Sequence, residues 1–144
     1  MTTTQNWFIW ALLSAVFAAL TAIFAKVGLE GVNSDFATLI RTFVIFFVLV
    51  AFVFLSGQWI NPLTLSAKTW TFLVLSAIAT GASWICYFRA LKIGDASKVA
   101  PVDKLSVILV AIFAVIFLHE RQSTRDWVGI LLVAAGVIVL GLRK

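Results

Sequence analysis

The stretch FATLIRTFVIFFVLVAFVFL, residues 36–55, holds a single charged side chain, Arg41, in 20 positions. A helix of about 20 predominantly apolar residues is long enough to cross the hydrocarbon core of a bilayer. Four further apolar stretches flank it, and short polar segments separate them all. The sequence therefore predicts an all-α, polytopic membrane protein, a bundle of five transmembrane helices over residues 7–29, 36–55, 70–91, 99–118 and 127–142.

The composition agrees with a membrane location. The chain is 62% hydrophobic and 12% charged, whereas soluble domains average roughly 45–50% and 25%. Its mean hydropathy is +1.10. A soluble fold of 144 residues could not bury that much apolar surface, so lipid must cover the excess. Because the connecting segments are short, we expect one domain over residues 1–144 with no linker. The N-terminus lacks a basic signal-peptide region, so we expect the first helix to be retained.

Several classes of function are excluded by missing motifs. Cys86 is the single cysteine and lies in an apolar run, and His119 is the single histidine, so no disulfide framework or metal-ligand cluster is expected. No Gly-rich phosphate loop, HExxH or GxSxG motif occurs. We therefore expect neither an enzyme nor a bound cofactor or metal. The net charge of +5 does not predict nucleic-acid binding, because the basic residues lie at helix ends and in short loops.

The distribution of basic residues predicts the orientation. Lys68, Arg121 and Arg125 fall on the side of the N-terminus, and the other eight fall on the side of the C-terminus. Cytoplasmic loops carry the excess of Lys and Arg. We therefore expect a multi-pass protein of the inner (plasma) membrane with its N-terminus outside and its C-terminus in the cytoplasm. If the basic residues buried for function are left out, the bias is weak enough for both orientations to coexist.

Charged residues within the predicted helices are the first candidates for a substrate site. Such residues cost a few kcal/mol or more at membrane depth, so they usually face the bundle or a water-filled cavity. The alternative is that long side chains reach the membrane surface from a helix end. Arg41 lies about 7–8 Å inside its helix, which favours a functional role. For Lys26, Arg89 and Lys104 both interpretations stay open. Adjacent residues of an ideal helix point about 100° apart, so Asp103 and Lys104 should face different directions.

Polar and aromatic residues supply further candidates. Ser14 is expected to face inward in the first predicted helix. Trp84 and Tyr87, three residues apart in the third, either line a cavity or belong to an aromatic belt at the membrane surface. Ser76, Thr80 and Gly81 are explained by close helix packing. Pro101 either occupies a first helical turn, where proline costs little, or breaks the helix beside a substrate site. We favour the first-turn interpretation.

Several short motifs are distributed along the chain. They are the ALKIGDA turn at residues 90–96, Ala100-Pro101, Glu120, Trp127 with Gly129, Gly136-Val137, the run WALLSAVFAAL at residues 10–20 and the FATLIR pattern ending at Arg41. With these motifs, the segment from residue 87 to residue 142 resembles the EamA-like domain of the drug/metabolite transporter superfamily. The N-terminal half matches more loosely, so that the resemblance covers nearly the whole chain. Where the family usually has Gly before the glutamate that ends the fourth helix, this chain has His119.

The resemblance implies a transporter of half the usual size. Most family members contain two such domains as inverted repeats with the substrate cavity between them. A single domain is therefore expected to pair with itself in the bilayer. An antiparallel homodimer would reproduce the inverted repeat, and a parallel one stays open.

Together these features predict a secondary transporter that moves a small metabolite by alternating access as a homodimer. The alternative is a non-transporting membrane scaffold or subunit that associates through its helices. The first predicted helix has no mid-membrane carboxylate, and the candidate buried charges are mostly basic. This favours amino acids or organic anions over lipophilic cations. The candidate substrate-binding residues are Ser14, Lys26, Arg41, Trp84, Tyr87, Asp103 and Lys104.

Overall fold

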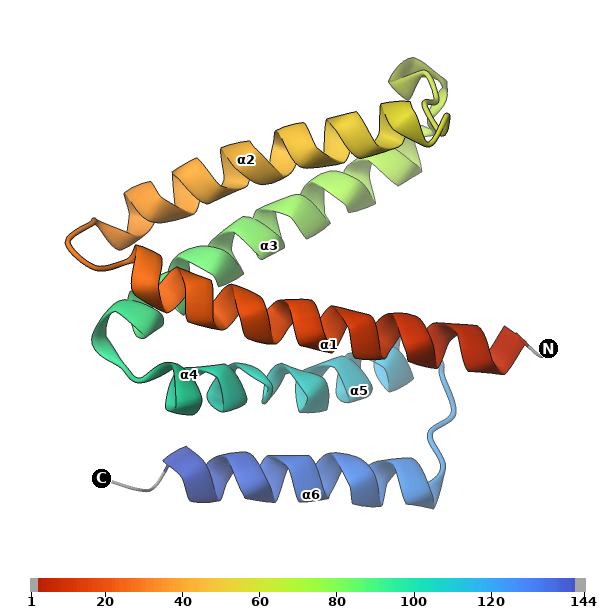
Figure 1. Ribbon diagram of the computed structural model, residues 1–144. Helices are drawn as coiled ribbons and strands as arrows, with labels where there is room; N and C mark the ends of the chain where they lie inside the picture. Colours follow the sequence, from red (N-terminus) through yellow and green to blue (C-terminus); the bar gives the residue numbers. More distant parts are fainter. Residues whose placement is uncertain (1–2, 142–144) are drawn as a thin grey trace. The chain divides into compact units, whose positions relative to one another are not determined.

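The computed structural model describes the backbone of residues 3–141 and the side chains of residues 7–141 (Figure 1). These residues form helices and turns with no β-strand. Five segments are long and apolar enough to cross a membrane, which confirms the prediction of an all-α, multi-pass membrane protein. Leu142, the predicted end of the fifth helix, and the basic residues Arg143 and Lys144 lie outside the described residues.

The helices begin two to four residues before their predicted starts, because their first turns are polar. Asn33 precedes α2 and its carboxamide oxygen accepts hydrogen bonds from the Asp35 and Phe36 amides at 2.9 and 3.2 Å. Ser123 and Asp126 form a reciprocal cap at the start of α6, which satisfies backbone donors that no helical partner can reach. The elements are α1 (Thr3–Gly28), α2 (Ser34–Leu55), the 3₁₀ helix η1 (Pro62–Thr64), α3 (Ala67–Ile93), α4 (Ala96–Asp103), α5 (Ser106–Phe117) and α6 (Thr124–Gly141).

Most apolar side chains are exposed within the chain. Only 6–11% of the most hydrophobic window of each span is buried, and the buried hydrophobic residues number eight among those described. In water, such exposure would be strongly unfavourable. Lipid or another protein chain must therefore cover the helices.

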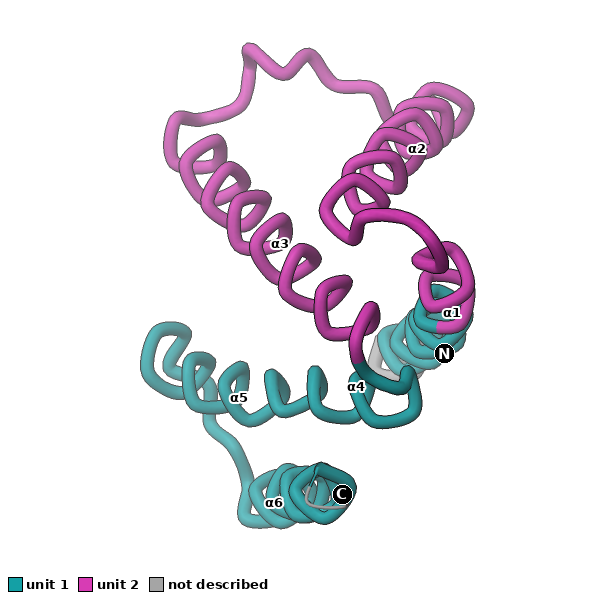
Figure 2. Tube along the Cα trace, turned by 90° about the vertical axis from the view of Figure 1, so that its left-hand side faces the viewer, with its two compact units in different colours: residues 1–22, 94–144 teal, residues 23–93 magenta. Residues whose placement is uncertain are grey.

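The chain divides into two units, coloured separately in Figure 2. Unit 1 comprises residues 1–22 and 94–144, and unit 2 comprises residues 23–93. The expectation of one domain over residues 1–144 stays a prediction.

In unit 2, α2 packs against α3, and two lysines hold the segment before α2 to the end of α3. Lys26 donates to the Leu91 carbonyl at 2.7 Å. Lys92 donates to the carbonyls of Leu29, at 2.8 Å, and Val32. Ammonium groups are well placed at a helix C-terminus, where the last carbonyls lack helical donors. These bonds fix one end of the α2–α3 pair.

In unit 1, α6 packs along both α4 and α5. Buried residues of α5 and α6 are small, among them Ala111, Ala114 and Ala134, which permits close helix approach in lipid. Gly129 and Gly136 lie seven residues apart, on one face of α6. A Cβ at either glycine would meet nothing within 4 Å, so this face carries no packing partner among the described residues.

The fourth membrane span is a broken helix, and the first-turn interpretation of Pro101 is wrong. The span begins at Ala96, so Pro101 lies inside α4 and supplies no N–H to the Ser97 carbonyl. Two residues later α4 ends, and the Lys104 and Leu105 amides bond to the carbonyls three residues back, at 2.9 and 3.0 Å. Such 3₁₀ geometry within a span often marks a hinge.

His119 ends this span in a left-handed conformation, with φ of 55°. This is the position where the family usually has glycine, which adopts positive φ without strain. The chain thus keeps the turn, although the His119 side chain makes a positive φ sterically unfavourable. The Glu120 amide closes the turn by donating to the Ala114 carbonyl at 3.1 Å.

Candidate functional site

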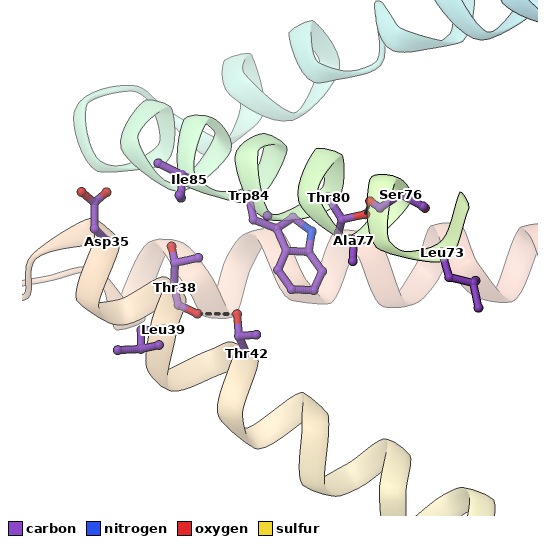
Figure 3. A pocket seen from close by; sticks show the side chains of 11 residues that line it. Asp35, Thr38, Leu39, Thr42, Leu73, Ser76, Ala77, Thr80, Trp84 and Ile85 are labelled. Carbon is purple, nitrogen blue, oxygen red and sulfur yellow. Dashed lines mark hydrogen bonds between the residues drawn. The ribbon is translucent and has the colours of Figure 1, made fainter. Parts of the chain in front are cut away.

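A cavity of about 660 Å³ lies between α2 and α3 in unit 2 (Figure 3). The Trp84 indole projects from α3 towards the side on which Thr38 and Thr42 of α2 lie. A Cβ at Gly81 would meet nothing within 4 Å, so this glycine leaves the cavity open. The lining residues are Asp35, Thr38, Leu39 and Thr42 from α2 and Leu73, Ser76, Ala77, Thr80, Gly81, Trp84 and Ile85 from α3.

The threonine hydroxyls in this cavity have their protons committed to the helix backbone. Thr42 donates to the Thr38 carbonyl at 2.7 Å, Thr38 to the Ser34 carbonyl at 2.8 Å, and Thr80 to the Ser76 carbonyl at 2.9 Å. A carbonyl can only accept, so each hydroxyl must be the donor. What these hydroxyls offer to the cavity is therefore acceptor lone pairs.

Asp35 lies at one end of the cavity and is paired with Arg89. The two side chains form parallel bonds of 2.9 Å, Nε to Oδ1, and 2.7 Å, Nη2 to Oδ2. This fork geometry is the strongest form of arginine–carboxylate contact. It joins the first turn of α2 to the last turns of α3.

Arg41 lies against the aromatic residues of α3. Its guanidinium carbon lies 4.3 Å from the centre of the Trp84 ring and 5.0 Å from that of Phe88, within range for attraction between a cation and an aromatic face. Its Nη1 atom is buried and has no hydrogen-bond partner among the described residues. A buried donor without an acceptor costs about 1–3 kcal/mol, and more when charged. Arg41 therefore carries an unmatched donor that an anionic group would satisfy.

Four of the seven predicted site residues belong to unit 2. Trp84 lines the cavity, and Arg41 contacts Trp84 without itself being among the lining residues. Tyr87 is half-buried, with its ring 6.3 Å from that of Phe88. Lys26 holds the Leu91 carbonyl. Arg41 and Trp84 are thus brought together, one helical turn from Tyr87.

The other three predicted residues belong to unit 1. Ser14 is exposed on α1. Asp103 and Lys104 contact each other, with Nζ 3.3 Å from Oδ2. This contact joins the ends of two flexible side chains, and the expectation that the two residues face different directions stays a prediction.

The hydroxyl residues of the cavity were not among the predicted site residues. Close packing was the expected role of Ser76, Thr80 and Gly81, yet they border open space. The missed signal is the matching Thr38 and Thr42, at four-residue spacing on the facing helix. Asp35 was missed because an acidic residue in a first turn is also typical of helix starts.

No group of three or more His, Cys, Asp or Glu residues that could hold a metal ion occurs in the part of the chain that the structure describes. The polar groups that border the cavity in unit 2 are hydroxyls, an indole and a carboxylate. The sequence matches the EamA-like transporter family over residues 5–142. The chain belongs to this family. This match confirms the resemblance drawn from the sequence motifs and identifies the protein as a member of a family of membrane transporters.

Individual relatives agree with this assignment. An uncharacterized transporter in the cobO 3′ region of Sinorhizobium sp is 58% identical over 138 residues, which are 96% of this chain and 98% of the relative. The uncharacterized transporter YvbV of Bacillus subtilis is 27% identical over 65% of this chain and 32% of its own length. The probable 4-amino-4-deoxy-L-arabinose-phosphoundecaprenol flippase subunit ArnE of an Enterobacter strain is 30% identical over 51% of this chain and 69% of its own. No solved structure matches the chain significantly.

Proposed function

We propose that this EamA-like protein is a secondary transporter that moves a small metabolite with an anionic group, such as an amino acid or another organic anion, by alternating access. The observation that carries the proposal is the buried Nη1 atom of Arg41, which lacks an acceptor among the described residues. A guanidinium in a low-dielectric site attracts an anion far more strongly than it would in water. Its planar fork also matches a carboxylate.

The proposed site centres on Arg41 and Trp84, which are in contact, with Tyr87 one turn away. Lys26, Ser14, Asp103 and Lys104 remain candidates for binding substrate in another conformational state. The 3₁₀ segment at Lys104 and Leu105 is the proposed hinge of alternating access, since discontinuous membrane helices commonly border transporter sites.

We further propose that the transporter is a homodimer in the inner membrane, antiparallel or parallel. Support comes from the low burial of all five spans and from the face of α6 that carries Gly129 and Gly136 and lacks a partner among the described residues. With Cys86 replaced by serine, Gly136→Cys should crosslink two copies in lipid if they pair in parallel through this face. A strictly monomeric particle that still transports contradicts this part of the proposal.

The alternative function is that of a non-transporting subunit of a larger assembly. It draws support from the relative ArnE, which is named as a subunit of a flippase. A subunit of this kind would need its helices for association and would not need the charge of Arg41.

Transport from vesicles separates the two functions. Proteoliposomes are loaded with a mixture of amino acids and organic acids, and the retained contents are measured by mass spectrometry. Wild-type protein should deplete at least one anionic metabolite, Arg41→Leu should retain it, and Arg125→Leu, which removes an exposed arginine of α6, should behave as wild type. Equal contents with wild-type protein and Arg41→Leu would favour the subunit.

A further inference from the structure

We propose that the cavity between α2 and α3 binds the cationic, hydrogen-bond-donating end of a ligand, an ammonium group attached to an apolar body. The transported class would then be molecules that carry both an amino group and an acid, with the acid near Arg41. The inference rests on the proposed function only for the statement that the bound molecule is the one transported.

The hydroxyl groups of the cavity favour a donor. The protons of Thr38, Thr42 and Thr80 are held by backbone carbonyls at 2.7–2.9 Å. A hydroxyl that donates to a helix carbonyl keeps two lone pairs that can accept. To bind a carboxylate instead, each threonine would have to break its backbone bond and leave that carbonyl with one partner fewer.

The charged residue of the cavity also favours a cationic hydrogen-bond donor. Asp35 is the one charged residue among the described residues that line it. Arg89 donates one hydrogen bond to each carboxylate oxygen of Asp35, but an ionised carboxylate offers about four acceptor positions. Asp35 therefore keeps acceptor capacity for an ammonium group.

Donors that could serve an anion are few on these walls. Among the described lining residues, only Trp84 Nε1 and the Ser76 hydroxyl are not seen to donate elsewhere. Mismatched polar groups are costly where water is excluded. The walls are thus rich in acceptors and poor in donors, the reverse of the surroundings that an anion requires.

The rest of the cavity suits an apolar ligand body. Leu39, Leu73, Ala77 and Ile85 line it together with the Trp84 indole. Its volume of about 660 Å³ falls in the usual range for small-molecule pockets, roughly 300–1,000 Å³. Trp84 also contacts Arg41, so one side chain adjoins both the acceptor-rich cavity and the guanidinium group.

The test compares two probes of matched size, phenethylammonium and 3-phenylpropionate, by calorimetric titration of the full chain in nanodiscs. Wild-type protein should bind phenethylammonium at least about tenfold more tightly, as expected for one charge-assisted hydrogen bond. Thr42→Val and Thr80→Val should each weaken it by about threefold to tenfold, because they remove an acceptor and keep the shape. Thr80→Ser should bind phenethylammonium as wild type does, because serine keeps the hydroxyl group.

Thr71 provides the matched control. It makes the same bond to the carbonyl four residues back, at 2.9 Å, on the same helix but outside the cavity. Thr71→Val should bind phenethylammonium as wild type does. The inference is overturned if 3-phenylpropionate binds equally or more tightly, or if neither threonine variant weakens phenethylammonium while the protein stays folded. Either result leaves anion transport through Arg41 standing.

Discussion

Arg89 holds Asp35 through two parallel hydrogen bonds that span 54 positions of sequence. The pair lies where α2 begins and α3 approaches its end, and Asp35 also lines the cavity between these helices. Both side chains keep considerable exposure, 63% for Arg89 and 45% for Asp35. The contact therefore positions the cavity wall and stays accessible to solvent ions.

Exchanging the two charges tests this contact. Asp35→Arg and Arg89→Asp should each lower the thermal unfolding temperature, because each removes both bonds of the fork and leaves two like charges side by side. The double variant Asp35→Arg, Arg89→Asp should recover part of the loss. The recovery should shrink with added salt, since exposed pairs are screened. Losses that simply add in the double variant would show that the pair contributes no coupling.

Gly81 tests whether the cavity is functional space. Gly81→Ala should raise stability by about 0.5–1 kcal/mol, the usual gain within a helix, because the added Cβ meets nothing within 4 Å. Gly81→Leu should fill the cavity and abolish phenethylammonium binding and transport. Ala82→Leu, on the exposed face beside it, serves as the control. Unchanged binding by a folded Gly81→Leu variant would rule out the cavity as the ligand site.

His119 makes a prediction about stability alone. An L-residue in the left-handed helical region costs roughly 1–2 kcal/mol, partly offset by the greater unfolded-state freedom of glycine. His119→Gly should therefore raise the unfolding free energy by up to about 1 kcal/mol. His119→Val should lower it, because a branched side chain tolerates positive φ poorly. The measurement is thermal unfolding in mild detergent, and equal stability of the two variants would argue against the left-handed turn.

The membrane spans were predictable from sequence because each holds close to the roughly 20 apolar residues that a bilayer requires. Their ends were not, because the capping residues are polar and lie outside the apolar pattern. The start at Ala96 instead of residue 99 had the largest consequence. It moved Pro101 from a first turn to a helix interior and concealed the break at Lys104.

The candidate site was predictable at the charged residue, because placing a charge inside the membrane is costly. It was not predictable at the hydroxyl residues, because the same spacing serves both helix packing and ligand binding. Arg41 was identified because a charged side chain inside a membrane helix is energetically costly and usually has a functional role. Thr80 and Ser76 were not, because hydroxyls at helical spacing serve helix packing as well as ligand binding. Only their position beside open space separates the two roles.

Orientation is tested with a reporter fused after the C-terminus. The bias of eight basic residues to three predicts a cytoplasmic C-terminus in at least half of the molecules. Comparable signals from both sides would accord with an antiparallel homodimer. A C-terminus found exclusively outside the cytoplasm contradicts the proposed orientation.

The central claim is that Arg41 binds the anionic group of the transported metabolite. Its most direct test is the uptake rate of the metabolite identified in the vesicle screen, measured for wild type, Arg41→Lys and Arg41→Ala at equal reconstitution. Loss of a charge-assisted contact should slow Arg41→Ala by about 10- to 100-fold. Arg41→Lys should be intermediate, because lysine keeps the charge and loses the fork. Uptake by folded Arg41→Ala at the wild-type rate would contradict the account.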